Sequence, residues 1–512
     1  VLRKVARKSS FNGLTPDQVL LGMIYDPQPW QVSKMIKVSH PQLKKMLGMD
    51  EDEKYASFIR FFNEKFQYVL TEDIAEANRK KPSERSKYDK DVIAVDERVN
   101  ICYMIYTGSL MRLFPLPNDP TNKWYAPGDA VNVFTGNDSL FVAGILPMYF
   151  NALDQGQESG NWEAATKTIQ SIYKYQQKMG AEVVISDQKL NYEILYNKAR
   201  VFNNLFFFYF TVGLIFLILL FVQLFSADSK VLNGLIQVFN WLIILGFAVH
   251  TLGLVLLWYI SGHAPWSNAY ESMVYIAWAT ILSGFIFSKN SKITLAATSL
   301  LTAFILMVAH LNWLDPEITN LVPVLDSYWL MIHVAIITAS YGFLALGALL
   351  GLFNLILIIT APRGIQKIQL TFKELTTINE MTITIGLFML TVGTFLGGVW
   401  ANESWGRYWG WDAKETWALA SVLVYSFVAH MRFIPGLRGG FAYNFTTLVS
   451  FSSIIMTYFG VNYYLSGLHS YAAGDPVPIP SFVYYTIVIV AIISFVAYRR
   501  WSSFNTGKDA KS

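Results

Sequence analysis

The stretch L-F-F-F-Y-F-T-V-G-L-I-F-L-I-L-L-F-V, residues 205–222, decides the fold class of this 512-residue chain. It carries no charged side chain, and apolar runs of similar length recur from here toward the C-terminus. A helix of about 20 apolar residues spans the hydrocarbon core of a bilayer. Because a helix also pairs its own backbone groups inside lipid, these runs predict an all-α, polytopic membrane helix bundle.

We expect about nine membrane spans in this bundle. Their predicted positions are residues 204–225, 233–260, 269–287, 293–311, 327–359, 381–400, 413–431, 445–465 and 481–498.

Composition divides the chain near residue 202. Hydrophobic residues make up 53% of the chain and charged residues only 15%, and most of the charge precedes residue 200. We predict a mainly helical soluble region at residues 1–202, one span at 203–230, and a second membrane domain at 231–512. Apolar spacing within the soluble region predicts helices at residues 55–70, 92–113 and 162–179.

Loop charges predict the orientation of the bundle. Lys and Arg gather in alternate loops, whereas the other set of loops holds only Arg407. By the positive-inside rule the loops at 261–268, 312–326, 401–412 and 466–480 face outward, together with the soluble region. No export signal precedes that region, so we expect a missing N-terminal portion. The net charge of +4 is small and does not indicate a nucleic-acid-binding surface.

The single cysteine, Cys102, excludes a disulfide framework and a Cys-x-x-Cys pair within this sequence. It lies in an apolar stretch, so we interpret it as a buried packing residue.

The run W-A-N-E-S-W-G-R-Y-W-G-W-D-A-K-E-T-W, residues 400–417, places Trp405, Tyr408, Trp409 and Trp411 close together at a bilayer edge. An aromatic belt is the alternative interpretation, since Trp and Tyr are enriched at membrane interfaces. A belt distributes aromatics over many helix ends, whereas here one loop interleaves them with glycines. The pattern therefore favours a platform for a planar ligand.

Two histidines flank this loop on the predicted outer side, His333 and His469. Two imidazoles on one face can ligate a haem iron from both sides, although a lone buried histidine more often serves packing. His430, near the inner end of its span, is a candidate intramembrane site or a residue that snorkels to the interface. For His263, in the outer loop at 261–268, a turn role is sufficient.

Four motifs in this order resemble the haem-handling family that carries the tryptophan-rich WWD signature. They are G-H-A-P-W-S-N-A-Y-E-S at 262–272, S-Y-W-L-M-I-H-V at 327–334, W-G-R-Y-W-G-W-D-A-K-E-T-W at 405–417, and N-Y-Y-L-S-G-L-H-S-Y at 462–471. The signature is most similar to the CcsA or ResC branch of the System II cytochrome c synthases, and the resemblance covers about residues 231–500. Ala413 departs from the proline that many members have there. The preceding region resembles the outward domain and last span of the CcsB or ResB partner.

This resemblance implies a haem lyase of a bacterial inner membrane, with its active face toward the periplasm. It would export haem b, hold it between the axial ligands His333 and His469, and promote thioether attachment to a CxxCH apocytochrome c. The platform would comprise Trp405, Tyr408, Trp409, Trp411 and Asp412, and His430 would belong to a haem site within the membrane. Arg407 and Lys414 are candidate partners of the haem propionates.

The implied partners are the CcsB-like portion and thiol-reducing proteins. Three alternatives remain open at this point: a haem transporter or chaperone without ligase activity, a quinone-linked membrane oxidoreductase, and a solute channel or transporter with an aromatic gate.

Overall fold

The computed structural model describes residues 2–505 except 7, 9, 81–84, 182, 226–228, 290, 311–313, 315, 319–320, 322–324, 362–365 and 466–478. The chain forms two compact units, Val1–Ser186 and Asp187–Ser512, which are described separately below. Helices dominate both units, so the predicted helical class is confirmed.

Unit 1 consists of short helices around two pairs of very short antiparallel strands. Its helices are α1 (Leu2–Val5), α2 (Pro16–Tyr25), α3 (Pro27–Val32), α4 (Pro41–Met46), the 3₁₀ helix η1 (Phe58–Phe61), α5 (Thr71–Arg79), α6 (Lys87–Tyr106), α7 (Pro127–Val133), α8 (Gly136–Ser159) and α9 (Glu163–Met179). Its strands are β1 (Ile36–Lys37), β2 (Tyr55–Ala56), β3 (Phe114–Pro115) and β4 (Trp124–Tyr125), paired β1 with β2 and β3 with β4.

Helix α6 organises the first half of unit 1. Its apolar face carries Val95, Val99 and Cys102 into a core shared with α1 and α2. Cys102 is fully buried and unbridged, which confirms the packing interpretation. Burial raises the pKa of its thiol to about 12, because the apolar surroundings disfavour the thiolate.

The N-terminus of α6 has a capping box between Ser86 and Asp89. Lys80 donates a hydrogen bond of 3.0 Å to the Asp89 carboxylate, and Ser86 donates two more through its amide and hydroxyl. These donors, Lys80 foremost, lower the pKa of Asp89 to about 2. The helix start is therefore anchored by a carboxylate that must stay ionised.

The predicted helix at residues 55–70 is wrong. Only η1 is helical there; it is followed by a tight turn closed by a bridge between Phe62 and Tyr68. The Asn63 side chain accepts the amide hydrogens of Lys65 and Gln67, and Phe66 adopts a φ of 58°. Asparagine competes for local backbone groups in this way, and the turn overrides the helical spacing of the aromatics. The predicted helices at 92–113 and 162–179 correspond to α6, which ends at Tyr106, and to α9.

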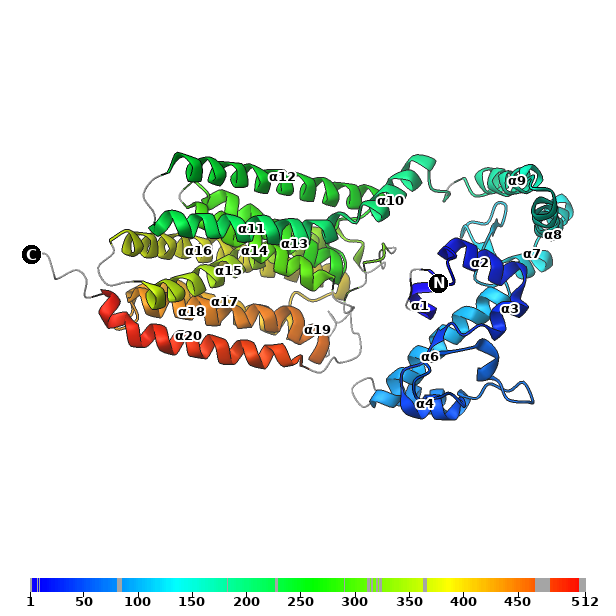
Figure 1. Ribbon diagram of the computed structural model, residues 1–512, viewed down its shortest axis with the longest axis horizontal. Coiled ribbons are helices and arrows are strands. Elements are labelled where there is room, and N and C mark those ends of the chain that lie inside the picture. Colours follow the sequence, from blue (N-terminus) through cyan, green and yellow to red (C-terminus); the bar gives the residue numbers. More distant parts are fainter. Residues whose placement is uncertain are drawn as a thin grey trace, which may run out of the picture. The chain divides into compact units, whose positions relative to one another are not determined.

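Unit 2 is a bundle whose long helices run roughly parallel to one another (Figure 1). Its helices are α10 (Asp187–Ala199), α11 (Val201–Phe225), α12 (Lys230–Ser261), α13 (Ala269–Phe287), α14 (Lys292–Ala309), α15 (Tyr328–Thr360), α16 (Gln366–Trp405), α17 (Ala413–His430), the 3₁₀ turn η4 (Met431–Phe433), α18 (Gly440–Ile455), the π-helix η5 (Met456–Gly460), α19 (Val461–Tyr464) and α20 (Ser481–Asn505).

Each of the nine predicted spans falls on a helix of this bundle. Within the described residues, seven helical segments are long and apolar enough to cross a membrane. The other two predicted spans correspond to α17 and to the continuous run of α18, η5 and α19. The chain is therefore a polytopic helical membrane protein.

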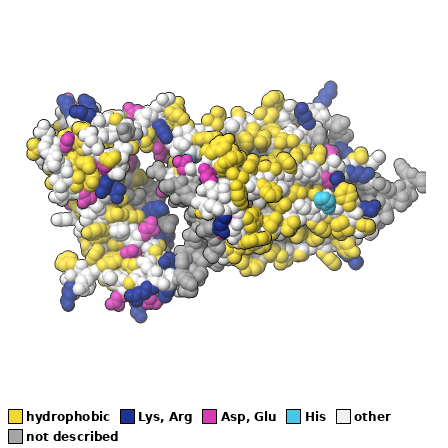
Figure 2. Space-filling view, turned by 180° about the vertical axis from the view of Figure 1, so that it is seen from behind, with side chains coloured by type: hydrophobic (Ala, Val, Ile, Leu, Met, Phe, Trp, Pro, Cys, Tyr) yellow, Lys and Arg dark blue, Asp and Glu magenta, His cyan; other side chains and the backbone are white. Residues whose placement is uncertain are grey.

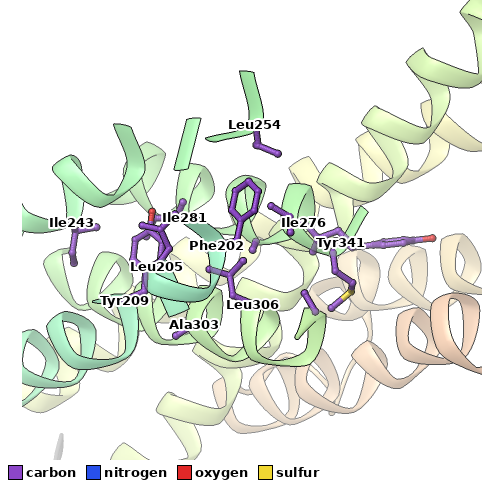
Figure 3. Close-up of a cluster of buried hydrophobic side chains, with 14 of the residues drawn as sticks. Phe202, Leu205, Tyr209, Ile243, Leu254, Ile276, Ile281, Ala303, Leu306 and Tyr341 are labelled. Carbon is purple, nitrogen blue, oxygen red and sulfur yellow. The ribbon is translucent and has the colours of Figure 1, made fainter. Parts of the chain in front are cut away.

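Helix α11, which contains the stretch that decides the fold class, packs against α12 and α14, and α14 packs in turn against α13. Figure 3 shows its Phe202, Leu205 and Tyr209 surrounded by apolar side chains of those helices, including Ile276 and Leu306. At Gly246 of α12 an added Cβ would lie 2.6 Å from the Phe208 ring, so the two helices approach closely there.

The outer surface of the bundle is apolar. Hydrophobic side chains cover much of its visible face in Figure 2. Helices α12 and α20 expose large side chains such as Leu252, Val255 and Phe495. Apolar surface on this scale suits contact with lipid rather than water.

Polar side chains converge inside the bundle where α15, α16 and α18 meet. Asn444 Oδ1 accepts hydrogen bonds from the amides of Asn354 at 2.9 Å and Asn379 at 3.1 Å. Asn444 in turn donates to Thr376, and Asn379 also donates to Thr447. All three asparagines are fully buried. This network ties three helices together, and it lies roughly 30 Å along α15 from His333 at 1.5 Å per residue.

Candidate functional site

A pocket of about 360 Å³ opens where the N-terminal ends of α15 and α17 meet the C-terminal part of α16. We call this the pocket end of the bundle. Further walls come from the α12–α13 loop (residues 262–268), the aromatic loop (residues 406–412) and the helix break around η5. Six elements of the fold thus meet at one cavity.

His333 lines this pocket from the second turn of α15 and is 6% exposed. Its Nδ1 lies 3.0 Å from the backbone oxygen of Trp329, one turn earlier. That oxygen only accepts, so the contact favours the tautomer with the proton on Nδ1 and the lone pair on Nε2. Histidines that ligate metals are commonly held in this way, through the nitrogen that does not bind the metal.

The His333 ring rests on the indole of Trp400, with ring centroids 5.4 Å apart and planes at 27°. Trp400 is fully buried and also contacts Trp405 at 4.8 Å. Gly397 lies beside the imidazole, and an added Cβ there would be in van der Waals contact with it, 3.4 Å from His333 Cδ2. At Gly393, one turn away, a Cβ would lie 2.5 Å from Ile337. Gly393 therefore lets α16 approach α15 closely, one turn from the histidine.

The aromatic loop places Tyr408 and Trp409 in the pocket lining. Gly406 ends α16 with a φ of +71°, and Trp411 adopts a φ of +56°, which is uncommon for a bulky side chain. Trp411 is 71% exposed and contacts Trp409 edge to face at 5.8 Å. Strained conformations of this kind persist where surrounding structure fixes them, often at functional sites.

Helix α17 starts directly after this loop with a capping box. Asp412 is its N-cap, and the Glu415 carboxylate accepts the amide hydrogens of Asp412 at 3.2 Å and Gly410 at 2.7 Å. Lys414 and Glu415 both line the pocket. The Arg407 guanidinium lies over Gly410, where an added Cβ would be 1.6 Å from Nη1. The loop is therefore closed on itself by polar contacts.

The last wall is a π-helical turn, η5. Tyr458 lines the pocket and donates a hydrogen bond of 3.0 Å to the Ala269 oxygen, at the start of α13. Thr457 lines it too and donates to the Trp417 oxygen. Asn462 follows in α19 as a third polar group of the lining. Single π turns within helices are frequently found at functional sites.

Of the residues predicted from sequence, the structure brings His333, Tyr408 and Trp409 together in one pocket. Trp405 and Trp411 adjoin it through their ring contacts with Trp400 and Trp409.

The other predicted residues have different positions. Asp412 serves as the N-cap of α17. His430 is exposed at the opposite end of α17, about 25 Å away at 1.5 Å per residue, with Nδ1 2.7 Å from the Ser426 oxygen. His469 lies outside the described residues.

Sequence reasoning missed several residues of the pocket. Trp400 is the support of His333, yet in the sequence it is one tryptophan among many. His263 and Trp266 enter from the α12–α13 loop, and the Trp266 indole donates a hydrogen bond of 3.1 Å to the Met331 oxygen. The motif at 262–272 was the available signal for this loop.

The architecture and the pocket define a class: a helical membrane protein with a histidine and an aromatic loop at one end of its bundle. Residues 266–469 match the family described as Cytochrome C assembly protein. The match includes the pocket segments from Trp266 through Asn462 and the predicted ligand His469.

Individual relatives indicate the same family. Cytochrome c biogenesis protein CcsA from Synechococcus sp. (strain CC9902) is 35% identical over 277 residues, which cover 48% of this chain and 88% of that protein. The CcsA protein of Parasynechococcus marenigrum is 34% identical over 291 residues, covering 50% of this chain and 93% of that protein. Protein NrfI from Wolinella succinogenes is 41% identical over 510 residues, 99% of this chain, and the chain spans 56% of the length of NrfI.

The chain belongs to the CcsA-type family of cytochrome c assembly proteins, and its role is in cytochrome c biogenesis.

Proposed function

We propose that this protein is a haem lyase, which holds haem b in the pocket and promotes its thioether attachment to a CxxCH apocytochrome c. His333 would supply one axial ligand and His469 the other. The observation that carries the proposal is the His333 imidazole, anchored through Nδ1 to Trp329 and stacked on Trp400 in an aromatic pocket. In a neutral imidazole held this way, Nε2 is the nitrogen that can coordinate a metal.

The remaining lining suits a porphyrin. Tyr408 and Trp409 offer aromatic surface for a flat macrocycle, and Lys414 offers a cation for a propionate. Trp405 and Trp411 would extend the platform, and Asp412 would hold its geometry through the cap of α17. The protein would then contribute binding and orientation, while the thiols add to the haem vinyl groups.

The rest of the proposal concerns haem delivery and location. His430, at the opposite end of α17, would belong to an earlier haem site within the membrane, and haem would pass from there to the pocket. We place the protein in a bacterial inner membrane with the pocket end toward the periplasm. A CcsB-like portion, of which residues 1–230 would be part, and thiol-reducing proteins would be its partners.

Absorption spectra of the detergent-purified protein test the ligand assignment. We expect a low-spin bis-histidine spectrum in wild type, its loss in His333→Gly and His469→Gly, and its return with added imidazole. His310→Gly is the matched control, because His310 is bonded to Leu306 at the end of α14 and is not part of the proposal. Full retention of the spectrum in His333→Gly without imidazole would exclude His333 as a ligand.

Covalent attachment to a reduced CxxCH peptide separates the lyase from a haem transporter or chaperone. A lyase yields a haem–peptide adduct that survives denaturation, whereas a transporter yields only bound haem. Failure to form the adduct while the spectrum is intact would overturn the lyase activity and leave haem binding standing.

A further inference from the structure

The α12–α13 loop brings a second imidazole, that of His263, into the same pocket as His333. The loop conformation is fixed by its own hydrogen bonds. Gly262 ends α12 at a φ of +77°, and the Ser261 hydroxyl donates to the His263 oxygen at 3.0 Å. Ser267 donates to the Ala264 oxygen at 2.8 Å. The His263 side chain is therefore positioned by a rigid turn and is about 10% exposed.

A buried carboxylate backs this imidazole. Glu271 Oε2 lies 3.9 Å from His263 Nδ1, and the Glu271 side chain is 2% exposed. The same oxygen accepts the Ser267 amide hydrogen at 2.9 Å. His263 Nδ1 also lies 3.2 Å from the Ala264 oxygen, which can only accept. These contacts favour the tautomer with the proton on Nδ1, in which Nε2 is the acceptor nitrogen of the ring, and they place the Glu271 carboxylate on the Nδ1 side.

An acid–base group has a clear task in thioether formation. The thiolate is the nucleophile, and a free cysteine thiol has a pKa of about 8.5, so the S–H proton must be removed. The terminal vinyl carbon must also gain a proton to become a methyl group. One base that accepts the first proton and donates it to carbon serves both needs, and such catalysis is worth about 10²–10⁴-fold in rate.

We propose that His263, positioned by Glu271, is the proton shuttle of the pocket. His263 Nε2 takes the proton from the thiol, the sulfur bonds to the inner vinyl carbon as the π bond breaks, and the imidazolium returns the proton to the terminal carbon. One S–H bond and one C=C π bond are lost, and one C–S and one C–H bond are formed. No oxidant or reductant is consumed. This inference rests on the proposed lyase function.

Other groups at the pocket have different tasks. His333 is the proposed iron ligand, and the Glu415 carboxylate already accepts two amide hydrogens of the aromatic loop. The titratable groups of the pocket lining and of the segments next to the α12–α13 loop are Lys189 on α10, Tyr270 and Glu271 on α13, His333 and Tyr341 on α15, Tyr408 in the aromatic loop, Lys414 and Glu415 on α17, and Tyr458 in η5. Of these, Glu271 is the carboxylate within 4 Å of His263.

The test compares wild type with His263→Gln in the full chain, loaded with haem and given a reduced CxxCH peptide. Two readouts are taken: the haem absorption spectrum, and the attachment rate as a function of pH. We expect an unchanged spectrum, a rate lowered by about 10²–10⁴-fold, and a pH profile that differs from that of wild type. Glu271→Gln should also lower the attachment rate and leave the spectrum unchanged, because His263 loses the carboxylate on its Nδ1 side.

His310→Gln is the matched control, and its rate and pH profile should equal those of wild type. An equal rate and an unchanged pH profile in His263→Gln would overturn the shuttle while the lyase function stands. Loss of the haem spectrum in His263→Gln would overturn it as well, since His263 would then serve haem binding. Absence of attachment by wild type itself would instead refute the lyase function on which the inference rests.

Discussion

The support that Trp400 gives to His333 can be tested by replacing the indole with a smaller side chain. Trp400 is fully buried, and its ring stacks on the imidazole at 5.4 Å. Trp400→Ala should destabilise the bundle by about 3–5 kcal/mol. Trp400→Phe leaves a cavity of roughly 40 Å³, which at about 24 cal/mol per Å³ costs only ~1 kcal/mol. The phenylalanine variant is therefore the informative one, because it should remain folded.

The stacked pair itself is worth about 0.5–1.5 kcal/mol, and the smaller phenylalanine ring should retain only part of it, so haem binding should weaken by up to about 12-fold. The assay is a haem titration followed by absorbance, together with a thermal melt in the same detergent. Trp501→Phe is the matched control, since Trp501 packs on Phe372 in another part of the bundle. Equal haem affinities in Trp400→Phe and Trp501→Phe would refute the idea that the indole orients His333.

Three further outcomes are expected. Asp89, with its pKa lowered to about 2 from an ordinary 3.8, stabilises unit 1 fully above about pH 4. That stabilisation should fade as pH falls toward 2, seen as faster hydrogen exchange in α6, and Asp89→Asn should abolish this pH dependence. Cys102, fully buried and with a pKa raised to about 12, should resist iodoacetamide at pH 8 until the protein is denatured; prompt labelling would contradict its burial. Asn444→Ala removes the acceptor of two buried amides and should lower stability by about 1–3 kcal/mol in a melt, whereas an unchanged melting temperature would mean that water replaces it.

The membrane helices could be predicted from sequence because apolar length alone specifies them. Predicted spans at 233–260 and 327–359 became Lys230–Ser261 and Tyr328–Thr360. Helix α16 differed, because it begins at Gln366 instead of residue 381. Its first turns carry Ile368, Phe372, Leu375 and Ile378 inward among polar residues, a helical pattern that a search for continuous apolar runs overlooks.

The pocket could be predicted only in part. The crowding of tryptophans in one loop, and His333 on the same predicted side, are visible along the chain. The partners of His333 are not, because Trp400 and Gly397 reach it through helix packing and not through sequence spacing. Residues 55–70 show the converse, since their aromatic spacing fits a helix while the Asn63 turn determines the structure.

The π turn at Met456–Gly460 sets the rotational phase of everything that follows it. A π turn holds one residue more than an α turn, so the backbone beyond Gly460 is rotated by about 100° relative to an unbroken α-helix. Before the turn, Ser450 and Ser453 are buried within the bundle; after it, Asn462 reaches the pocket. A one-residue deletion here would leave the span intact as a helix and yet turn Asn462 away from the cavity. The number of residues in this segment thus determines which side of the helix Asn462 faces, as well as the length of the span.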